Sequence, residues 1–178
     1  MAETMRAGQM VGLNDMRCVE APIPAISDDQ ILVKTKMASI CGSDLHVVCH
    51  GAGITQTMPC PHRYPGQQRI GEDDDSKHSD VSAGWRVLCF PFAGMAEGFS
   101  EYQRMNGKYV LPLPESDVPE EQLLMAQQLG TVIFAARQRP VDVVGKTVLV
   151  MGQGSAGLFW AYWMKRSGAA RVIVSDLS

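Results

Sequence analysis

A glycine-rich turn between two short apolar runs is the feature that most constrains the fold of this chain. Residues 146–151 (KTVLVM) form one apolar run, and residues 171–175 (RVIVS) form the other. Residues 155–167, which lie between them, have a helical pattern that stops at Gly168. The order of strand, glycine-rich turn, helix and strand predicts a βαβ unit whose two strands are parallel.

The turn reads Gly152-Gln153-Gly154-Ser155-Ala156-Gly157, which is G-x-G-x-x-G. In this context we expect Gly152 to permit the tight turn, Gly154 to let a pyrophosphate approach the backbone, and Gly157 to let the helix lie close to the strand. The helix N-terminus would offer N–H groups and the positive end of its dipole to the phosphate. Gly152, Gly154, Ser155, Ala156 and Gly157 are therefore candidate cofactor-binding residues. The alternative is a glycine-rich turn without a ligand.

An acidic residue, Asp176, ends the second strand, 19 residues after Gly157. A carboxylate at this place accepts hydrogen bonds from the ribose hydroxyls and repels a 2′-phosphate. We therefore expect NAD, rather than NADP, as the cofactor. The alternative is that Asp176 only caps a turn.

Composition excludes several classes of function. The 178 residues carry a net charge of −3 without a basic stripe, so no nucleic-acid partner is expected. No apolar run is long enough for a membrane span or a secretory signal, so we expect a cytoplasmic protein without a membrane partner. The five cysteines are odd in number and form no C-x-x-C pair, which argues against a disulfide framework and against a compact four-cysteine zinc site.

The region before Pro119 has a β-like pattern of short apolar runs separated by glycine and proline. This pattern suits a small β-barrel or sandwich. The strand candidates are residues 31–38, 86–92, 100–105 and 109–113. Residues 71–80 (GEDDDSKHSD) predict a solvated loop. From Pro119 the pattern is helical to about Arg137, with acidic residues in the first turn.

The segment Cys41-Gly42-Ser43-Asp44-x-His46, just after a predicted strand, resembles the catalytic-zinc segment of the medium-chain dehydrogenase/reductase family, in its zinc-type alcohol dehydrogenase branch. With the glycine turn downstream, the likeness covers nearly the whole chain. It implies an α/β protein with a β-rich N-terminal part. A GroES-like β-barrel catalytic domain would occupy residues 1–118 and a linking helix region residues 119–144. The start of a Rossmann domain, a doubly wound parallel sheet that binds NAD, would occupy residues 145–178.

The resemblance also implies roles for the residues of this segment. Cys41 would bind Zn²⁺ as a thiolate, Ser43 would relay the proton of the alcohol, His46 would pass that proton to solvent, and Asp44 would orient the site. Zinc would polarise the alcohol oxygen, and the nicotinamide would accept the hydride. Each residue also has an ordinary structural alternative. Cys41 could be a small buried residue, Ser43 and Asp44 turn residues, and His46 a surface histidine.

The sequence departs from the family where the other zinc ligands are expected. Family members have Gly-His-Glu followed by a glycine, and this chain has Gly66-Gln67-Gln68-Arg69-Ile70-Gly71. A glutamine amide is a poor ligand for Zn²⁺. The third ligand position falls at Gln127 or Gln128. An alternative is a separate zinc site drawn from the other soft ligands, which are Cys41, His46, Cys49, His50, Cys60 and His62.

Together these features predict an oxidoreductase that resembles zinc-dependent alcohol or polyol dehydrogenases, with NAD and Zn²⁺ as cofactors and a small-molecule alcohol or carbonyl compound as substrate. We expect weak or no turnover from this chain by itself, because a doubly wound sheet requires more strands than the two found here. The alternatives are a zinc-free medium-chain reductase and a non-catalytic remnant or interaction module. Which alcohol is the substrate stays open, and so does assembly into a homo-oligomer.

Overall fold

The computed structural model describes residues 3–51, 54, 58–62, 64–66, 68–90, 97–138 and 141–177. The chain divides into two compact units, Met1–Leu124 and Met125–Ser178, which we call the N-terminal and C-terminal units. The boundary falls inside α2 (Glu120–Gln138). Within the described residues, no helix has the length and apolar character needed to cross a membrane.

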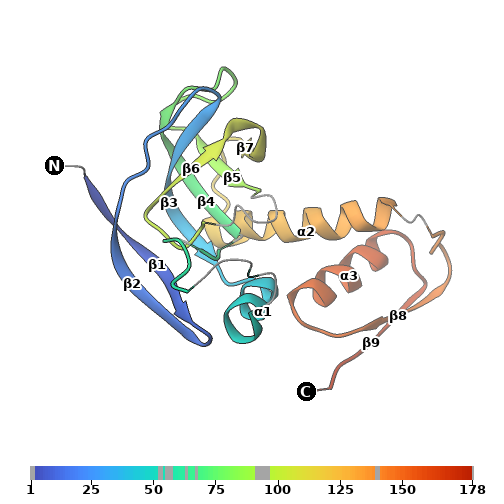
Figure 1. The fold of residues 1–178 in the computed structure, drawn as a ribbon. Coiled ribbons are helices and arrows are strands. Elements are labelled where there is room, and N and C mark those ends of the chain that lie inside the picture. The colour runs from blue at the N-terminus through green and yellow to red at the C-terminus, as the bar shows by residue number, and fades with distance from the viewer. Residues whose placement is uncertain are drawn as a thin grey trace. The chain divides into compact units, whose positions relative to one another are not determined.

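The N-terminal unit consists of a hairpin and a curled antiparallel sheet (Figure 1). In the hairpin, β1 (Thr4–Gly12) pairs with β2 (Asp15–Pro22). The five-stranded sheet has the order β6-β3-β4-β5-β7. Its strands are β3 (Gln30–Ser39), β4 (Gln68–Ser76), β5 (Arg86–Cys89), β6 (Tyr102–Asn106) and β7 (Val110–Pro112). Helix α1 (Gly42–His50) follows β3, and a short 3-10 helix, η1 (Gly107–Tyr109), precedes β7.

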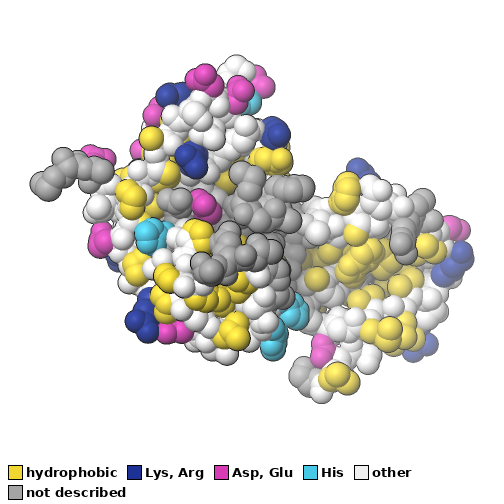
Figure 2. All heavy atoms as spheres, viewed as in Figure 1, with side chains coloured by type: hydrophobic (Ala, Val, Ile, Leu, Met, Phe, Trp, Pro, Cys, Tyr) yellow, Lys and Arg dark blue, Asp and Glu magenta, His cyan; other side chains and the backbone are white. Residues whose placement is uncertain are grey.

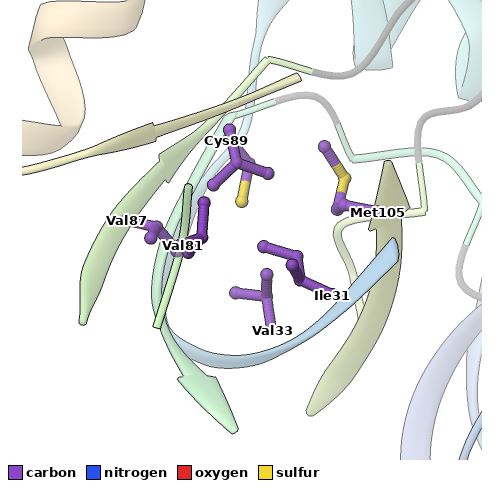
Figure 3. Close-up of a cluster of buried hydrophobic side chains, with 7 residues drawn as sticks. Ile31, Val33, Val81, Val87, Cys89 and Met105 are labelled. Atoms are coloured by element: carbon purple, nitrogen blue, oxygen red, sulfur yellow. The ribbon is translucent and has the colours of Figure 1, made fainter. Parts of the chain in front are cut away.

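Apolar side chains from several strands form the core inside the curled sheet (Figure 3). Ile31 and Val33 are fully buried, and they alternate along β3 with less buried residues, as expected for a strand with one apolar face. The cluster consists of Ile31, Val33, Val81, Val87, Cys89, Met105 and Val110. The β-rich sequence pattern therefore corresponds to one side of a barrel-like sheet.

The prediction that residues 71–80 form a solvated loop is wrong for most of that segment. Strand β4 continues to Ser76 and pairs with β3 on one side and with β5 on the other. Asp73 is only 1% exposed, whereas Glu72 forms an ion pair with Lys36, with 2.8 Å between Nζ and Oε2. The run of charges suggested a solvated loop, but backbone pairing with two neighbouring strands determines the structure here. The sequence patterns also did not predict the hairpin of β1 and β2.

The C-terminal unit contains the predicted βαβ unit. Strands β8 (Thr147–Met151) and β9 (Arg171–Ser175) are parallel and are joined through α3 (Ser155–Arg166). Helix α2 begins directly after Pro119 and ends at Gln138, close to the predicted bounds. Hydrophobic side chains gather on the visible face of this unit (Figure 2). Residues in the unit that are more than half exposed include Phe134, Val141, Val144, Leu149, Met151 and Leu158.

Candidate functional site

The first candidate site, in the N-terminal unit, is the turn that joins β3 to α1. Cys41 is the N-cap residue of α1 and has an extended backbone conformation. Its side chain is half-buried, and its backbone N–H donates a hydrogen bond to Asp44 Oδ2 over 2.8 Å. The fold therefore holds Cys41 at the start of the helix through the acid that follows it by three residues.

Asp44 lies between two segments that are far apart in the sequence. It is 2% exposed, and its Oδ1 accepts a hydrogen bond from the backbone N–H of Gly66 over 3.1 Å. Because Oδ2 binds the N–H of Cys41, one carboxylate joins the Cys41 turn to the segment that begins Gly66-Gln67-Gln68. Asp44 is thus placed where it can position both segments.

Gly66 fixes the path of that second segment. Its φ is +127°, and a Cβ atom added to it would lie 2.6 Å from the backbone nitrogen of Phe99 and 2.8 Å from Cα of Gly98. The N–H of Gly98 donates to the carbonyl of Gly66 over 3.0 Å. A side chain does not fit at position 66, so this glycine of the motif is required for packing.

Ser43 and His46 lie on α1, directly after Cys41. The hydroxyl oxygen of Ser43 is buried and has no hydrogen-bond partner among the described residues. His46 is exposed, and its ring centroid lies 5.9 Å from that of His50. The two residues of the predicted proton relay therefore share one helix but are not hydrogen-bonded to each other. A ligand oxygen that forms a hydrogen bond with this buried hydroxyl stabilises the complex, because it satisfies a polar group that otherwise has no partner.

The side chains at the expected zinc-ligand positions are mostly unsuited to bind zinc. Gln68 is 4% exposed, and its Oε1 accepts a hydrogen bond from the Ser39 hydroxyl; Gln67 lies outside the described residues. Gln128 donates from Nε2 to the Ser155 hydroxyl over 2.7 Å, at the start of α3. In the part of the chain that the structure describes, no three His, Cys, Asp or Glu side chains gather to hold a metal ion. Zinc sites use thiolate, imidazole and carboxylate ligands, so the residues present do not fit Zn²⁺.

The six residues of the separate zinc site considered from the sequence are all described, and no three of them gather in this structure. All five cysteines are free thiols. Cys60 and Cys89 are buried, and burial raises the pKa of both thiols. A thiol with a raised pKa stays protonated and is a weak metal ligand.

The second candidate site is the glycine turn of the C-terminal unit. Gly152 has a φ of +88°, and its N–H donates to the carbonyl of Ser175 over 2.7 Å. A Cβ atom on Gly157 would lie 1.8 Å from the carbonyl oxygen of Gly152, whereas a Cβ atom on Gly154 would meet nothing within 4 Å. The first and third glycines therefore shape the turn, and the second keeps the space above the backbone open.

The start of α3 and the end of β9 complete the site at the glycine turn. Gly154 is the N-cap residue of α3, and its carbonyl accepts the bond from the N–H of Leu158. The N–H groups of Ser155, Ala156 and Gly157 consequently have no partner within the helix. Asp176 lies beside the turn, because its Oδ2 accepts a hydrogen bond from the backbone N–H of Gln153. An open backbone, a helix N-terminus and a nearby carboxylate fit a pyrophosphate and its ribose.

Two further contacts were not predicted from the sequence. Ser39 binds Gln68, and the two residues are direct partners in the register of β3 and β4. Gln128 binds Ser155 between two helices of the C-terminal unit. The only sequence signal for either contact is that all four residues are polar, which does not identify the partner. Both contacts depend on strand register or helix packing.

Comparison with known proteins gives consistent likenesses. A family model described as "Alcohol dehydrogenase GroES-like domain" matches residues 27–115. L-threonine 3-dehydrogenase from Ruegeria pomeroyi is 28% identical over 188 residues, which covers 90% of this chain and 53% of that protein. The enzyme of the same name from Rhizobium rhizogenes is 26% identical over 182 residues, which covers 88% of this chain and 52% of that protein. The chain therefore spans about half the length of the curated relatives it matches.

Solved structures show the same fold at low sequence identity. Galactitol-1-phosphate dehydrogenase from Escherichia coli has a TM-score of 0.83 and 24% identity, covering 98% of this chain and 56% of that one. L-idonate 5-dehydrogenase from the same organism has a TM-score of 0.83 and 23% identity, covering 100% of this chain and 59% of that one. These likenesses confirm the predicted fold class, a GroES-like curled sheet followed by the start of a Rossmann-type sheet.

Proposed function

The chain belongs to the medium-chain dehydrogenase/reductase family, in its zinc-type alcohol dehydrogenase branch, and on this basis we propose that it binds NAD for hydride transfer from an alcohol or polyol. The observation that carries the proposal is the glycine turn, in which Gly157 lies against Gly152 while the space at Gly154 stays open. A turn of this shape between a parallel strand and a helix suits a dinucleotide pyrophosphate. The nicotinamide, when bound, accepts the hydride.

The residues of this chain have distinct roles in the proposed function. The backbone at Gly152, Gly154 and the first turn of α3 binds the pyrophosphate, and the carboxylate of Asp176 binds the ribose hydroxyls. Ser43 binds the alcohol oxygen through its buried hydroxyl, and as it accepts the alcohol proton it releases its own hydroxyl proton to a water molecule. Exposed His46 accepts that proton from water and releases it to solvent. Asp44 holds the turn that carries both residues.

A zinc-free reductase of the same family is the second candidate function. The bond between Gln68 and Ser39 favours it, because the amide oxygen that would face a metal already accepts a hydrogen bond. The two candidates share the dinucleotide site and differ in whether a metal polarises the substrate oxygen. A zinc measurement on the purified chain distinguishes them.

Replacing Gly154 with valine is expected to weaken NAD binding at least about tenfold while the chain stays folded. Gly154 has an ordinary φ of −63°, and its Cβ position is open, so the valine fits the protein but occupies the space of the pyrophosphate. Calorimetric titration with NAD measures the change. Gly130→Val is the matched control, because a Cβ atom there also meets nothing within 4 Å. Unchanged NAD affinity in Gly154→Val would refute binding of the pyrophosphate at the glycine turn.

Replacing Asp176 with asparagine is expected to lower the preference for NAD over NADP by about tenfold, since a carboxylate near a 2′-phosphate repels it by about 1 to 4 kcal/mol. Asparagine keeps one side-chain oxygen to accept from the backbone N–H of Gln153 or Leu177. Parallel titrations with NAD and NADP give the ratio. If both affinities move together and the ratio stays constant, Asp176 does not select the cofactor.

A further inference from the structure

The candidate metal site lacks the residues for Zn²⁺ but contains hydrogen bonds that connect the same segments. A catalytic zinc ion needs about three protein ligands, and here only Cys41 is a suitable one at the expected positions. In such a site the ion would join the Cys41 turn to the segment that begins at Gly66. In this chain a carboxylate makes that connection.

The connection through Asp44 consists of two buried hydrogen bonds. Its two oxygens accept from the backbone N–H groups of Cys41, over 2.8 Å, and Gly66, over 3.1 Å. Asp44 is 2% exposed, so water does not compete for these bonds. The two segments are therefore held together without an ion.

Gln68 fits a site without a cation. A carboxylate at this position, buried like Gln68 at 4% exposure, would need a positive charge nearby to offset its desolvation. A zinc ion supplies that charge in a metal site. A neutral amide of the same shape needs only hydrogen bonds, and Oε1 of Gln68 accepts one from Ser39, its cross-strand partner. A buried neutral amide is thus the kind of residue expected where no cation is bound.

We propose that this site is metal-free, that Asp44 and the bond between Ser39 and Gln68 are sufficient to hold its segments without an ion, and that Cys41 presents a free thiol beside Ser43. The inference deepens the proposed function because it selects the zinc-free form of the chemistry. Asp44, Ser39 and Gln68 are positioning residues in this site.

The test uses the purified full chain, dialysed first against zinc sulfate and then against zinc-free buffer. We expect far less than one zinc ion per chain by elemental analysis, and a melting temperature that zinc or a chelator changes by no more than about 1 °C. Cys41 is expected to react with a thiol reagent at the same rate with and without zinc, after subtraction of the signal from Cys41→Ser. Stoichiometric zinc, or protection of Cys41 by zinc, would overturn the inference.

Two variants test the hydrogen bonds themselves. Asp44→Asn is expected to lower the melting temperature by about 5 °C, because an amide has only one oxygen and cannot accept both N–H bonds. Asp28→Asn, at an exposed turn, is the matched control and should melt like the parent. Gln68→Glu is expected to melt lower than the parent at neutral pH and not to be rescued by zinc. If zinc raises the melting temperature of Gln68→Glu above that of the parent, the position is a metal-ligand site.

Titration with NAD separates this inference from the proposed function. A chain that binds NAD and also one zinc ion would overturn the metal-free site and leave the proposed function standing. A chain that binds neither would overturn the dinucleotide proposal alone.

Discussion

Replacing Gly157 with alanine is expected to unfold the βαβ segment and to abolish dinucleotide binding with it. The new Cβ atom would lie 1.8 Å from the carbonyl oxygen of Gly152, which is backbone and cannot move aside without opening the turn. Overpacking of this kind costs about 3 kcal/mol or more. A small unit has only a few kcal/mol of net stability, so this loss is comparable to the whole.

Hydrogen exchange of backbone amides measures this effect locally. Amides of β8 and β9 are expected to lose their protection in Gly157→Ala, while amides of β3 and β4 keep theirs. Gly130→Ala, the same substitution at an exposed and open position of α2, should stabilise its helix by about 0.5 to 1 kcal/mol. Protection of β8 and β9 that survives in Gly157→Ala would show that the close approach of helix and strand is not required.

Replacing Asp73 with asparagine is expected to stabilise the N-terminal unit by about 2 kcal/mol at neutral pH. Asp73 is 1% exposed, and neither carboxylate oxygen has a partner in hydrogen-bonding geometry among the described residues. Burial raises the pKa of this carboxyl, and the nearby Ser76 hydroxyl and Asp75 amide lower it only in part. A carboxylate at this position is therefore poorly compensated when it ionises, and an isosteric amide carries no such charge.

The sign of the pH dependence follows from the raised pKa. Below the unfolded-state pKa of about 3.9 the carboxyl is protonated in both states and does not destabilise the fold. Because the folded-state pKa is higher than the unfolded-state pKa, the proton favours the folded state. This contribution to stability is lost as pH rises through the folded-state pKa, so the advantage of Asp73→Asn over the parent grows from acid to neutral pH. Urea unfolding across that range measures the difference. Asp74→Asn, on an exposed neighbour, should change stability by less than about 0.5 kcal/mol. A constant difference at all pH values would contradict the assigned cause.

The parts of the fold that local sequence determines were predicted well. The βαβ unit follows from two apolar runs and a glycine turn, and α2 starts after Pro119 because proline suits the first turn of a helix. Strand β4 was not predicted, because its charged residues suggest a loop. The strand is fixed by pairing with β3 and β5, which are distant in sequence, and this pairing buries Asp73. Side-chain type alone does not contain that information.

The candidate site divides in the same way. The motif around Cys41 forms the turn at the start of α1, and Asp44 lies buried beside Cys41. The partners of these residues come from other segments. The bond from Gly66 to Asp44 and the bond from Ser39 to Gln68 both cross at least 22 positions of the chain. Spacing along the sequence does not predict such contacts, because they depend on the register of β3 and β4 and on the path of the Gly66 segment.

The glycines of this chain differ in the space around them, and they are therefore expected to differ in how freely they are substituted during evolution. Selection for a folded chain alone preserves Gly66 and Gly157, because a side chain at either position would overlap neighbouring backbone. Position 154 has room for other residues, so only selection for a bound dinucleotide would preserve glycine there. Close orthologues that keep glycine at positions 66 and 157 but have other residues at position 154 would be proteins that retain the fold and have lost the cofactor.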